Sequence, residues 1–124
     1  MKTSVLLQEV RQFGDFEWYP TTEEIIQVVK SRLKDSTSSV LDVGAGDGRV
    51  LMAMTNGDKY AIEKSKPLIA ALPASIFIIG TEFHEQTLLD KRVDYIFSNP
   101  PYSEYEVWAE KIILEAQAEY VYLV

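Results

Sequence analysis

The sequence contains no cysteine, which excludes disulfides, thiolate metal sites and cysteine nucleophiles. His84 is its one histidine, and because no metal-binding or catalytic motif surrounds it, it is predicted to be a surface residue. Long apolar runs are also lacking. The run near the N-terminus ends at Gln8 and Glu9, which makes it too weak for a signal peptide, and no stretch is long enough to span a membrane. These absences predict a cytoplasmic protein without a metal ion.

The sequence also contains fewer basic than acidic residues. There are 12 Lys and Arg against 19 Asp and Glu, which gives a net charge of −7. A surface of that sign repels a phosphate backbone unless its charges are strongly segregated, so the chain alone is predicted to bind nucleic acid poorly. Its 124 residues, 47% hydrophobic and 25% charged, have the size and composition of one globular domain.

The apolar segments alternate between strand-like and helix-like patterns. Thr21 and Glu24 have the spacing of a capping box at the start of the first predicted helix. Helices are predicted over residues 23–33, 49–55, 66–72 and 103–117, and strands over 39–43, 59–63, 75–79, 93–98 and 118–124. This alternation predicts an α/β fold whose parallel sheet of about five strands has helices on both faces. In such sheets, ligands bind beyond the carboxyl ends of the strands.

A glycine-rich loop, "LDVGAGDG" (residues 41–48), follows the first predicted strand. It departs from the dinucleotide fingerprint, because Arg49 stands where the third glycine should fall. Asp42 and Asp47 would repel a pyrophosphate but attract an ammonium or sulfonium group. The loop therefore favours a cationic ligand, and a plain tight turn is the alternative.

Acidic residues also follow the second and third predicted strands. Glu63 lies 19 positions beyond Gly44, close to the spacing expected of an acid that binds ribose hydroxyls. Glu82 and Phe83 form a polar and aromatic pair that suits an adenine ring. The alternatives are a solvated strand-end carboxylate for Glu63 and a core-anchoring ring for Phe83.

The most distinctive segment, Asn99-Pro100-Pro101-Tyr102, follows the fourth predicted strand. Each proline fixes its own φ and restricts the residue before it, and neither offers an N–H. The turn therefore presents carbonyl oxygens and the Asn99 amide oxygen as acceptors for an amino group, with Tyr102 as a flat face for a planar substrate. An amino group held in this way is oriented to attack a methyl carbon. A rigid strand-to-helix turn is the structural alternative.

From about Trp18 to residue 124, these segments resemble the class I S-adenosylmethionine-dependent methyltransferases that modify exocyclic or amide nitrogens. The resemblance implies a Rossmann-like sheet and S-adenosylmethionine as cofactor. It assigns cofactor binding to Asp42, Gly44, Ala45, Gly46, Glu63, Lys64, Glu82 and Phe83, and catalysis to Asn99, Pro100, Pro101 and Tyr102. The segment "WYPTTEE" is similar to one that closes over the cofactor in DNA adenine methyltransferases, which adds Tyr19, Pro20 and Thr21 to the predicted cofactor contacts. Residues 1–20 are accordingly predicted to form an N-terminal extension and cofactor-closing segment.

The same tetrapeptide occurs in enzymes that methylate adenine in DNA or RNA, guanine in ribosomal RNA, or a glutamine amide in release factors. The "YPT" segment favours adenine in DNA, which would be flipped out of the duplex and stacked on Tyr102, so DNA is the predicted partner. A protein glutamine or ribosomal RNA is the alternative target. A different class of alternative is an inactive cofactor-binding remnant, or a subunit that needs a partner chain.

The number of predicted strands, five, is smaller than in the family that the sequence resembles. The complete sheet of that family has seven strands, and the two that are not found here normally form an antiparallel hairpin beside the fifth. Residues 1–124 are therefore predicted to be a single, partial methyltransferase domain that lacks the C-terminal hairpin. Without it, residues 119–124 would form an exposed hydrophobic edge, which predicts a homodimer or a partner chain at that edge.

Overall fold

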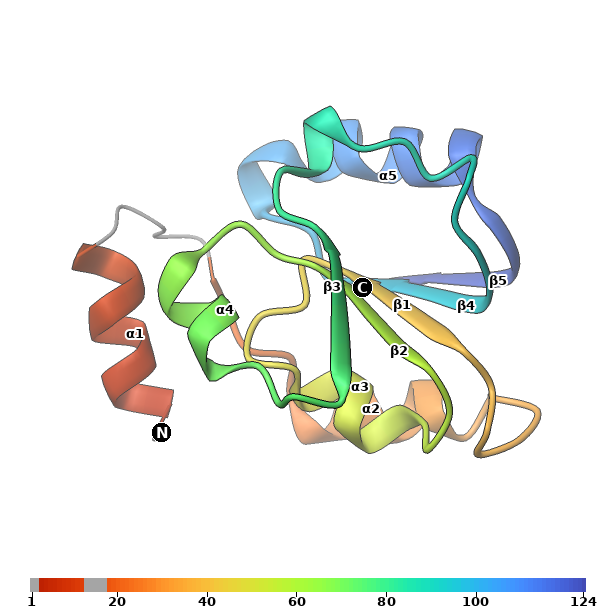
Figure 1. Ribbon diagram of the computed structural model, residues 1–124, viewed down its shortest axis with the longest axis horizontal. Helices are drawn as coiled ribbons and strands as arrows, with labels where there is room; N and C mark the ends of the chain where they lie inside the picture. Colours follow the sequence, from red (N-terminus) through yellow and green to blue (C-terminus); the bar gives the residue numbers. More distant parts are fainter. Residues whose placement is uncertain (1–2, 13–17) are drawn as a thin grey trace.

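The computed structural model describes residues 3–12 and 18–124, which form a parallel sheet flanked by helices (Figure 1). The helices are α1 (Thr3–Gln12), α2 (Glu23–Lys30), α3 (Arg49–Met54), α4 (Lys66–Ala71) and α5 (Tyr105–Glu115), with the short 3₁₀ helices η1 (Phe83–Glu85) and η2 (Tyr102–Glu104). The strands are β1 (Val40–Val43), β2 (Lys59–Ile62), β3 (Ile76–Gly80), β4 (Arg92–Ser98) and β5 (Gln117–Leu123). The predicted α/β fold is confirmed.

The strand order, β3-β2-β1-β4-β5, reverses at β1. The chain runs outward from β1 to β2 and β3, returns to the other side of β1 as β4, and continues to β5. Val43 at the end of β1 pairs with Ile62 of β2 and with Ser98 of β4, so three strands end side by side. Open parallel sheets bind ligands in the crevice beyond such a reversal.

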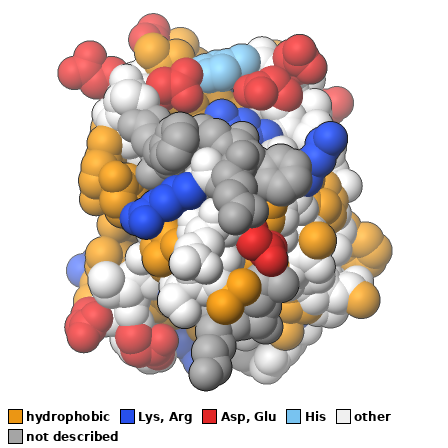
Figure 2. All heavy atoms as spheres, turned by 90° about the vertical axis from the view of Figure 1, so that its left-hand side faces the viewer, with side chains coloured by type: hydrophobic (Ala, Val, Ile, Leu, Met, Phe, Trp, Pro, Cys, Tyr) orange, Lys and Arg blue, Asp and Glu red, His pale blue; other side chains and the backbone are white. Residues whose placement is uncertain are grey.

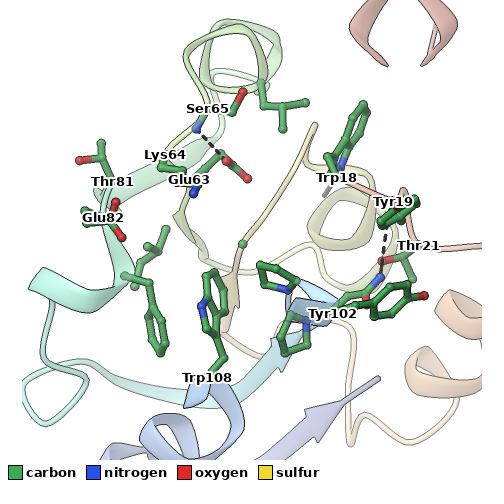
Figure 3. A pocket seen from close by; sticks show the side chains of 17 residues that line it. Trp18, Tyr19, Thr21, Glu63, Lys64, Ser65, Thr81, Glu82, Tyr102 and Trp108 are labelled. Atoms are coloured by element: carbon green, nitrogen blue, oxygen red, sulfur yellow. Dashed lines mark hydrogen bonds between the residues drawn. The ribbon is translucent and has the colours of Figure 1, made fainter. Parts of the chain in front are cut away.

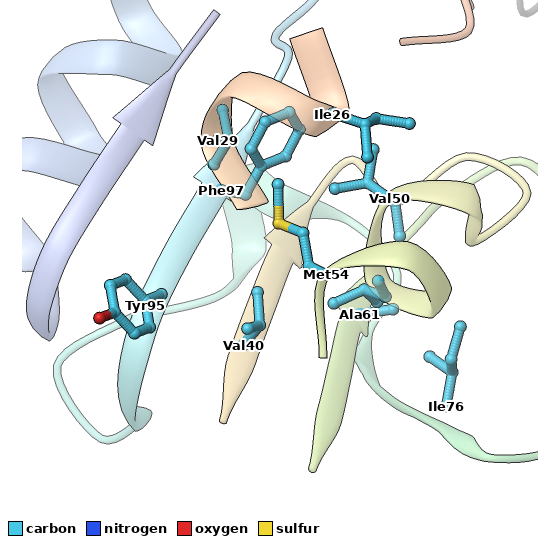
Figure 4. Packing of buried hydrophobic residues seen from close by; sticks show 11 residues of the cluster. Ile26, Val29, Val40, Val50, Met54, Ala61, Ile76, Tyr95 and Phe97 are labelled. Carbon is cyan, nitrogen blue, oxygen red and sulfur yellow. The ribbon is translucent and has the colours of Figure 1, made fainter. Parts of the chain in front are cut away.

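The lower face of the sheet in Figure 1 is covered by α2 and α3. Ile26 of α2 and Val50 and Met54 of α3 pack against Val40 and Phe97 of the sheet (Figure 4). These side chains are at most 3% exposed, and burying each apolar side chain contributes about 1.5–3 kcal/mol. This cluster fixes the position of β1, whose four residues are all buried.

The upper face is covered by α5 and the segment around η1 (Figure 1). Trp108 and Ile112 of α5 pack with Phe83 of η1 against Leu41 and Ile96. Trp108 and Ile112 lie four residues apart on one helical face, as the sequence predicts. The ring of Phe83 is therefore part of the core.

Helix α1 is not among the helices predicted from the sequence. Its Leu6 and Val10 are both 1% exposed and pack with Leu68 of α4 and the partly buried Trp18. Of the predicted N-terminal segment 1–20, residues 1–2 and 13–17 lie outside the described residues.

The predicted capping box at the start of α2 is wrong. Thr22, not Thr21, is the N-cap, and its hydroxyl accepts a hydrogen bond from Ile25 N at 3.4 Å. The hydroxyl of Thr21 instead accepts one from the Asn99 side chain. Thr21 therefore contacts the turn that follows β4.

The sheet has two edges, at β3 and β5. Strand β5 has seven residues and carries Tyr120, which is 48% exposed.

Within residues 3–12 and 18–124, no helix is both long and apolar enough to cross a membrane.

Candidate functional site

The loop after β1 turns at three glycines with positive φ. Gly44, Gly46 and Gly48 have φ values of 83°, 60° and 85°, which residues with a Cβ rarely adopt. The first two also allow close packing. A Cβ on Gly46 would lie 2.5 Å from Trp18 Nε1, and one on Gly44 would lie 3.2 Å from the Trp108 ring. The loop therefore lies directly against two indole rings.

Glu63 fastens this loop to the loop after β2. Its Oε1 accepts a hydrogen bond from Gly46 N at 2.8 Å, and its Oε2 accepts one from Ser65 N at 2.9 Å. The residue is 8% exposed. These two hydrogen bonds hold the carboxylate at the junction of the two loops.

These loops and the turn after β4 surround a cavity of about 350 Å³ (Figure 3). Small-molecule sites have volumes of about 300–1,000 Å³. The lining contains the following residues that the sequence predicts: Tyr19, Thr21, Gly44, Glu63, Lys64, Glu82, Phe83, Asn99, Pro100, Pro101 and Tyr102. The structure thus brings the predicted ribose acid, the predicted adenine loop and the Asn-Pro-Pro-Tyr turn around one space.

Four predicted cofactor residues do not line this cavity: Pro20, Asp42, Ala45 and Gly46. Ala45 is 5% exposed and belongs to the core beside α2 and α3. Gly46 acts through its backbone N–H, which holds Glu63. Pro20 lines a separate hollow beside Thr3.

The expectation that Asp42 and Asp47 attract a cationic ligand needs correction. Asp47 forms an ion pair with Arg49, with 2.8 Å between Oδ2 and Nη2. Asp42 is 1% exposed, and its burial, with a smaller contribution from Glu63, raises the pKa of its carboxyl well above the usual range. Glu63 and Glu82 are the acidic side chains in the cavity lining.

The turn after β4 is fixed against β1 and against the segment before α2. Ser98 is fully buried and donates a hydrogen bond to Val43 O at 2.8 Å. The side-chain NH2 of Asn99 donates to Thr21 Oγ1 at 3.3 Å and to Tyr19 O at 3.5 Å. The rings of Tyr102 and Tyr19 are stacked, with centroids 5.4 Å apart and planes 20° apart. Tyr102 is 69% exposed, so a flat aromatic surface stands at the mouth of the cavity.

Trp108 and Ser65 are candidate site residues that were not predicted from the sequence. Both line the cavity and are 7% and 3% exposed. Among the described residues, Trp108 Nε1 and Ser65 Oγ have no hydrogen-bond partner. Buried polar atoms are seldom left unpaired, so these two atoms are suited to bind a ligand. Trp18, Ile62, Leu68 and Thr81 complete the lining.

His84 is exposed, as predicted, but it has a partner that the sequence does not reveal. Its Nε2 lies 3.0 Å from Glu104 Oε1, and the two side chains are 40% and 41% exposed. The pair links η1 to η2.

Figure 2 shows the side of the molecule where α1 and α4 lie, and acidic side chains gather there near the single histidine. In the described parts of the chain, no group of three acidic or histidine side chains could hold a metal ion.

No protein-family model matches the chain. In sequence it is similar to the release factor glutamine methyltransferase of Lactococcus lactis subsp. lactis (strain IL1403), with 28% identity over 96 residues. The match covers 70% of this chain and 36% of that protein, so the chain spans about a third of this curated relative's length.

In structure, the chain is similar to the precorrin-6y C5,15-methyltransferase of Geobacter metallireducens. The TM-score is 0.63 at 19% identity, and the match covers 84% of this chain and 63% of that one. A second similar structure is an S-adenosylmethionine-dependent methyltransferase from Geobacter sulfurreducens in complex with S-adenosyl-L-homocysteine. Its TM-score is 0.62 at 18% identity, with coverage of 80% and 45%. The chain therefore has the Rossmann-like fold of class I methyltransferases.

Proposed function

We propose that this chain carries the cofactor-binding and catalytic part of an S-adenosylmethionine-dependent N-methyltransferase. The observation that carries the proposal is that Glu63 and the Asn99–Tyr102 turn line the same cavity, where the strand order reverses. The similar proteins support it, because the relative and both structural neighbours are methyltransferases, and one neighbour was solved with S-adenosyl-L-homocysteine.

The cavity residues fit the chemistry of this cofactor. Glu63 offers acceptors for ribose hydroxyls, and Glu82 offers a polar edge to a purine. Phe83 is mainly a core residue, 2% exposed, and it lines the cavity from behind Glu82. Trp108 Nε1 and Ser65 Oγ are buried polar atoms that a ligand would satisfy. When bound, S-adenosylmethionine would supply a methyl group on a positively charged sulfur, for transfer to the target nitrogen with release of a neutral thioether and of one proton from the nitrogen to solvent.

The turn after β4 holds the target nitrogen. Asn99 Oδ1 and the carbonyl oxygen of Pro100 are acceptors for the two N–H groups of an amide or amine. Tyr102 offers its exposed ring to the planar group that carries the nitrogen. Catalysis by this turn is mainly positional, because it orients the nitrogen toward the methyl carbon.

The target that we infer is the side-chain amide of a protein glutamine. The similar Lactococcus lactis protein is a release factor glutamine methyltransferase, whereas none of the similar proteins described above supports adenine in DNA. The "YPT" segment, which favoured adenine, has another use here, since Tyr19 and Thr21 accept hydrogen bonds from Asn99. The net charge of −7 also disfavours DNA and ribosomal RNA as partners.

Calorimetric titration tests the cofactor half of the proposal. The chain is expected to bind S-adenosylmethionine but not NAD. The variant Trp108→Phe keeps an aromatic ring but loses the N–H, and one hydrogen bond of about 1–1.5 kcal/mol corresponds to roughly tenfold weaker binding. No binding by the wild-type chain would contradict the cofactor assignment, and equal affinities would contradict the role of Trp108.

Labelled transfer tests the target. With methyl-labelled S-adenosylmethionine, label is expected in a protein extract, on a glutamine side chain identified by mass spectrometry, and not in adenine-containing duplex DNA. Label in DNA would restore the adenine target. Cofactor binding without transfer to either would support the inactive-remnant alternative.

Strand β5 is proposed to pair with β5 of a second copy. An exposed strand edge offers unpaired backbone groups, and this one has seven residues against five in β3. Light scattering at rising concentration is expected to show a dimer, and Tyr120→Glu to weaken it. Phe77→Glu, at the 57% exposed Phe77 of the β3 edge, is the matched control and should leave the dimer intact. A monomer at every concentration would contradict this proposal.

A further inference from the structure

The hydrogen bonds of Asn99 define which end of its amide faces the segment before α2. Its Nδ2 lies 3.5 Å from Tyr19 O and 3.3 Å from Thr21 Oγ1. A backbone carbonyl oxygen can accept a hydrogen bond but cannot donate one. The group that faces Tyr19 O must therefore be the NH2, and the amide oxygen is turned away from that carbonyl.

Thr21 is well placed to hold this orientation. It is 8% exposed, lines the same cavity as Asn99, and leaves the capping of α2 to Thr22. The Thr21 hydroxyl oxygen can accept a hydrogen bond from the Asn99 NH2. If the Asn99 amide were turned around, its oxygen would face Tyr19 O and the hydrogen bond to that carbonyl would be lost. The stacked rings of Tyr19 and Tyr102 tie the same two segments together a second time.

We propose that Thr21 is a positioning residue, which, together with the carbonyl of Tyr19, fixes the Asn99 amide so that Oδ1 is presented to the target nitrogen. This inference rests on the proposed function. If the bond to Thr21 is lost, only the longer bond to Tyr19 O still holds the amide. The amide then rotates more easily and presents its NH2, which cannot accept a hydrogen bond from an amine. The segment 18–21 then acts on the substrate end of the site through Asn99.

Kinetics of two Thr21 variants test the proposal. Thr21→Val keeps the shape of the side chain and removes the acceptor, and it is expected to lower kcat by about 10–100-fold, the range for a misplaced reacting group. The KM for the protein substrate and the Kd for S-adenosylmethionine should change less than about threefold. Thr21→Ser keeps the hydroxyl and should restore kcat to within about threefold of the wild type. A purely structural role would lower thermal stability without this separation.

A nuclear magnetic resonance measurement reads the amide directly and needs no turnover. The side-chain NH2 signals of Asn99, assigned by their loss in Asn99→Asp, should shift and exchange faster with solvent in Thr21→Val but not in Thr21→Ser. If Thr21→Val does not fold, Thr21→Ala takes its place. Unchanged Asn99 signals in the acceptor-less variant would overturn the proposal. If the wild-type chain transfers no methyl group, the proposed function fails, and these signals still decide whether Thr21 orients Asn99.

Discussion

Replacing Asn99 by alanine is expected to lower kcat for methyl transfer by about 100-fold or more, because in the proposed function the target nitrogen then loses the acceptor that orients it. Asn99 lies in the cavity wall that follows β4, whereas Glu63 follows β2 on the far side of β1. The loss should therefore appear in turnover, and the calorimetric Kd for S-adenosylmethionine should change less than about threefold.

The matched control is Asn56→Ala. Asn56 is an exposed residue between α3 and β2, away from the cavity lining, so this variant removes the same side chain without touching the site. Its kcat is expected to equal that of the wild type. If Asn99→Ala keeps full kcat, the turn is a structural strand-to-helix connection and the transfer site lies elsewhere.

Much of the fold could be predicted because each strand is a short apolar run bounded by polar or glycine-containing segments. All four residues of β1 are buried, which is typical of a central parallel strand. Helix α1 was not predicted, because its short apolar run shows no clear helical period in the sequence. Leu6 and Val10 are buried because they pack against Leu68, which lies more than fifty positions further along the chain.

The strand-end rule predicted the position of the candidate site residues that stand in loops. Glu63 and Asn99 follow parallel strands on either side of β1, so their positions in the sequence suffice to bring them to one edge. The same rule misplaced Asp42, which lies within β1. Side chains alternate along a strand, and Asp42 falls on the face of Val40, which packs in the core beside α2 and α3.

Trp108 could not be recognised as a site residue from the sequence. Its spacing from Ile112 is that of an apolar helical face, and such a pattern does not distinguish a core contact from the wall of a cavity. What makes Trp108 a site residue is the combination of Gly44 against its ring and an indole N–H without a partner among the described residues. Both depend on how α5 sits on the sheet.

Replacing Asp42 by asparagine is expected to raise the free energy of unfolding at pH 7 by about 1–3 kcal/mol, because asparagine stays neutral and so removes the cost of ionising a buried carboxyl. Burial, and then the Glu63 carboxylate, raise the pKa of Asp42 well above its usual range in the folded state. The folded protein therefore holds this proton more tightly than the unfolded chain does. Stability from this group is fully present below the unfolded pKa of about 3.9 and is lost as pH rises through the folded pKa.

Urea denaturation of both proteins between pH 3 and pH 8 measures this difference. Asparagine cannot ionise, so the two curves should coincide near pH 3 and separate as the pH rises, with the variant the more stable. Other carboxylates act in the opposite direction. Hydrogen bonds from Thr37 lower the pKa of Asp35, and one from Lys91 lowers that of Asp90, so their contributions fall at acidic pH. They are common to both proteins and cancel in the difference. Curves that stay parallel across the whole range would mean that Asp42 ionises in the folded state as easily as in the unfolded one, with a partner for its charge inside the sheet.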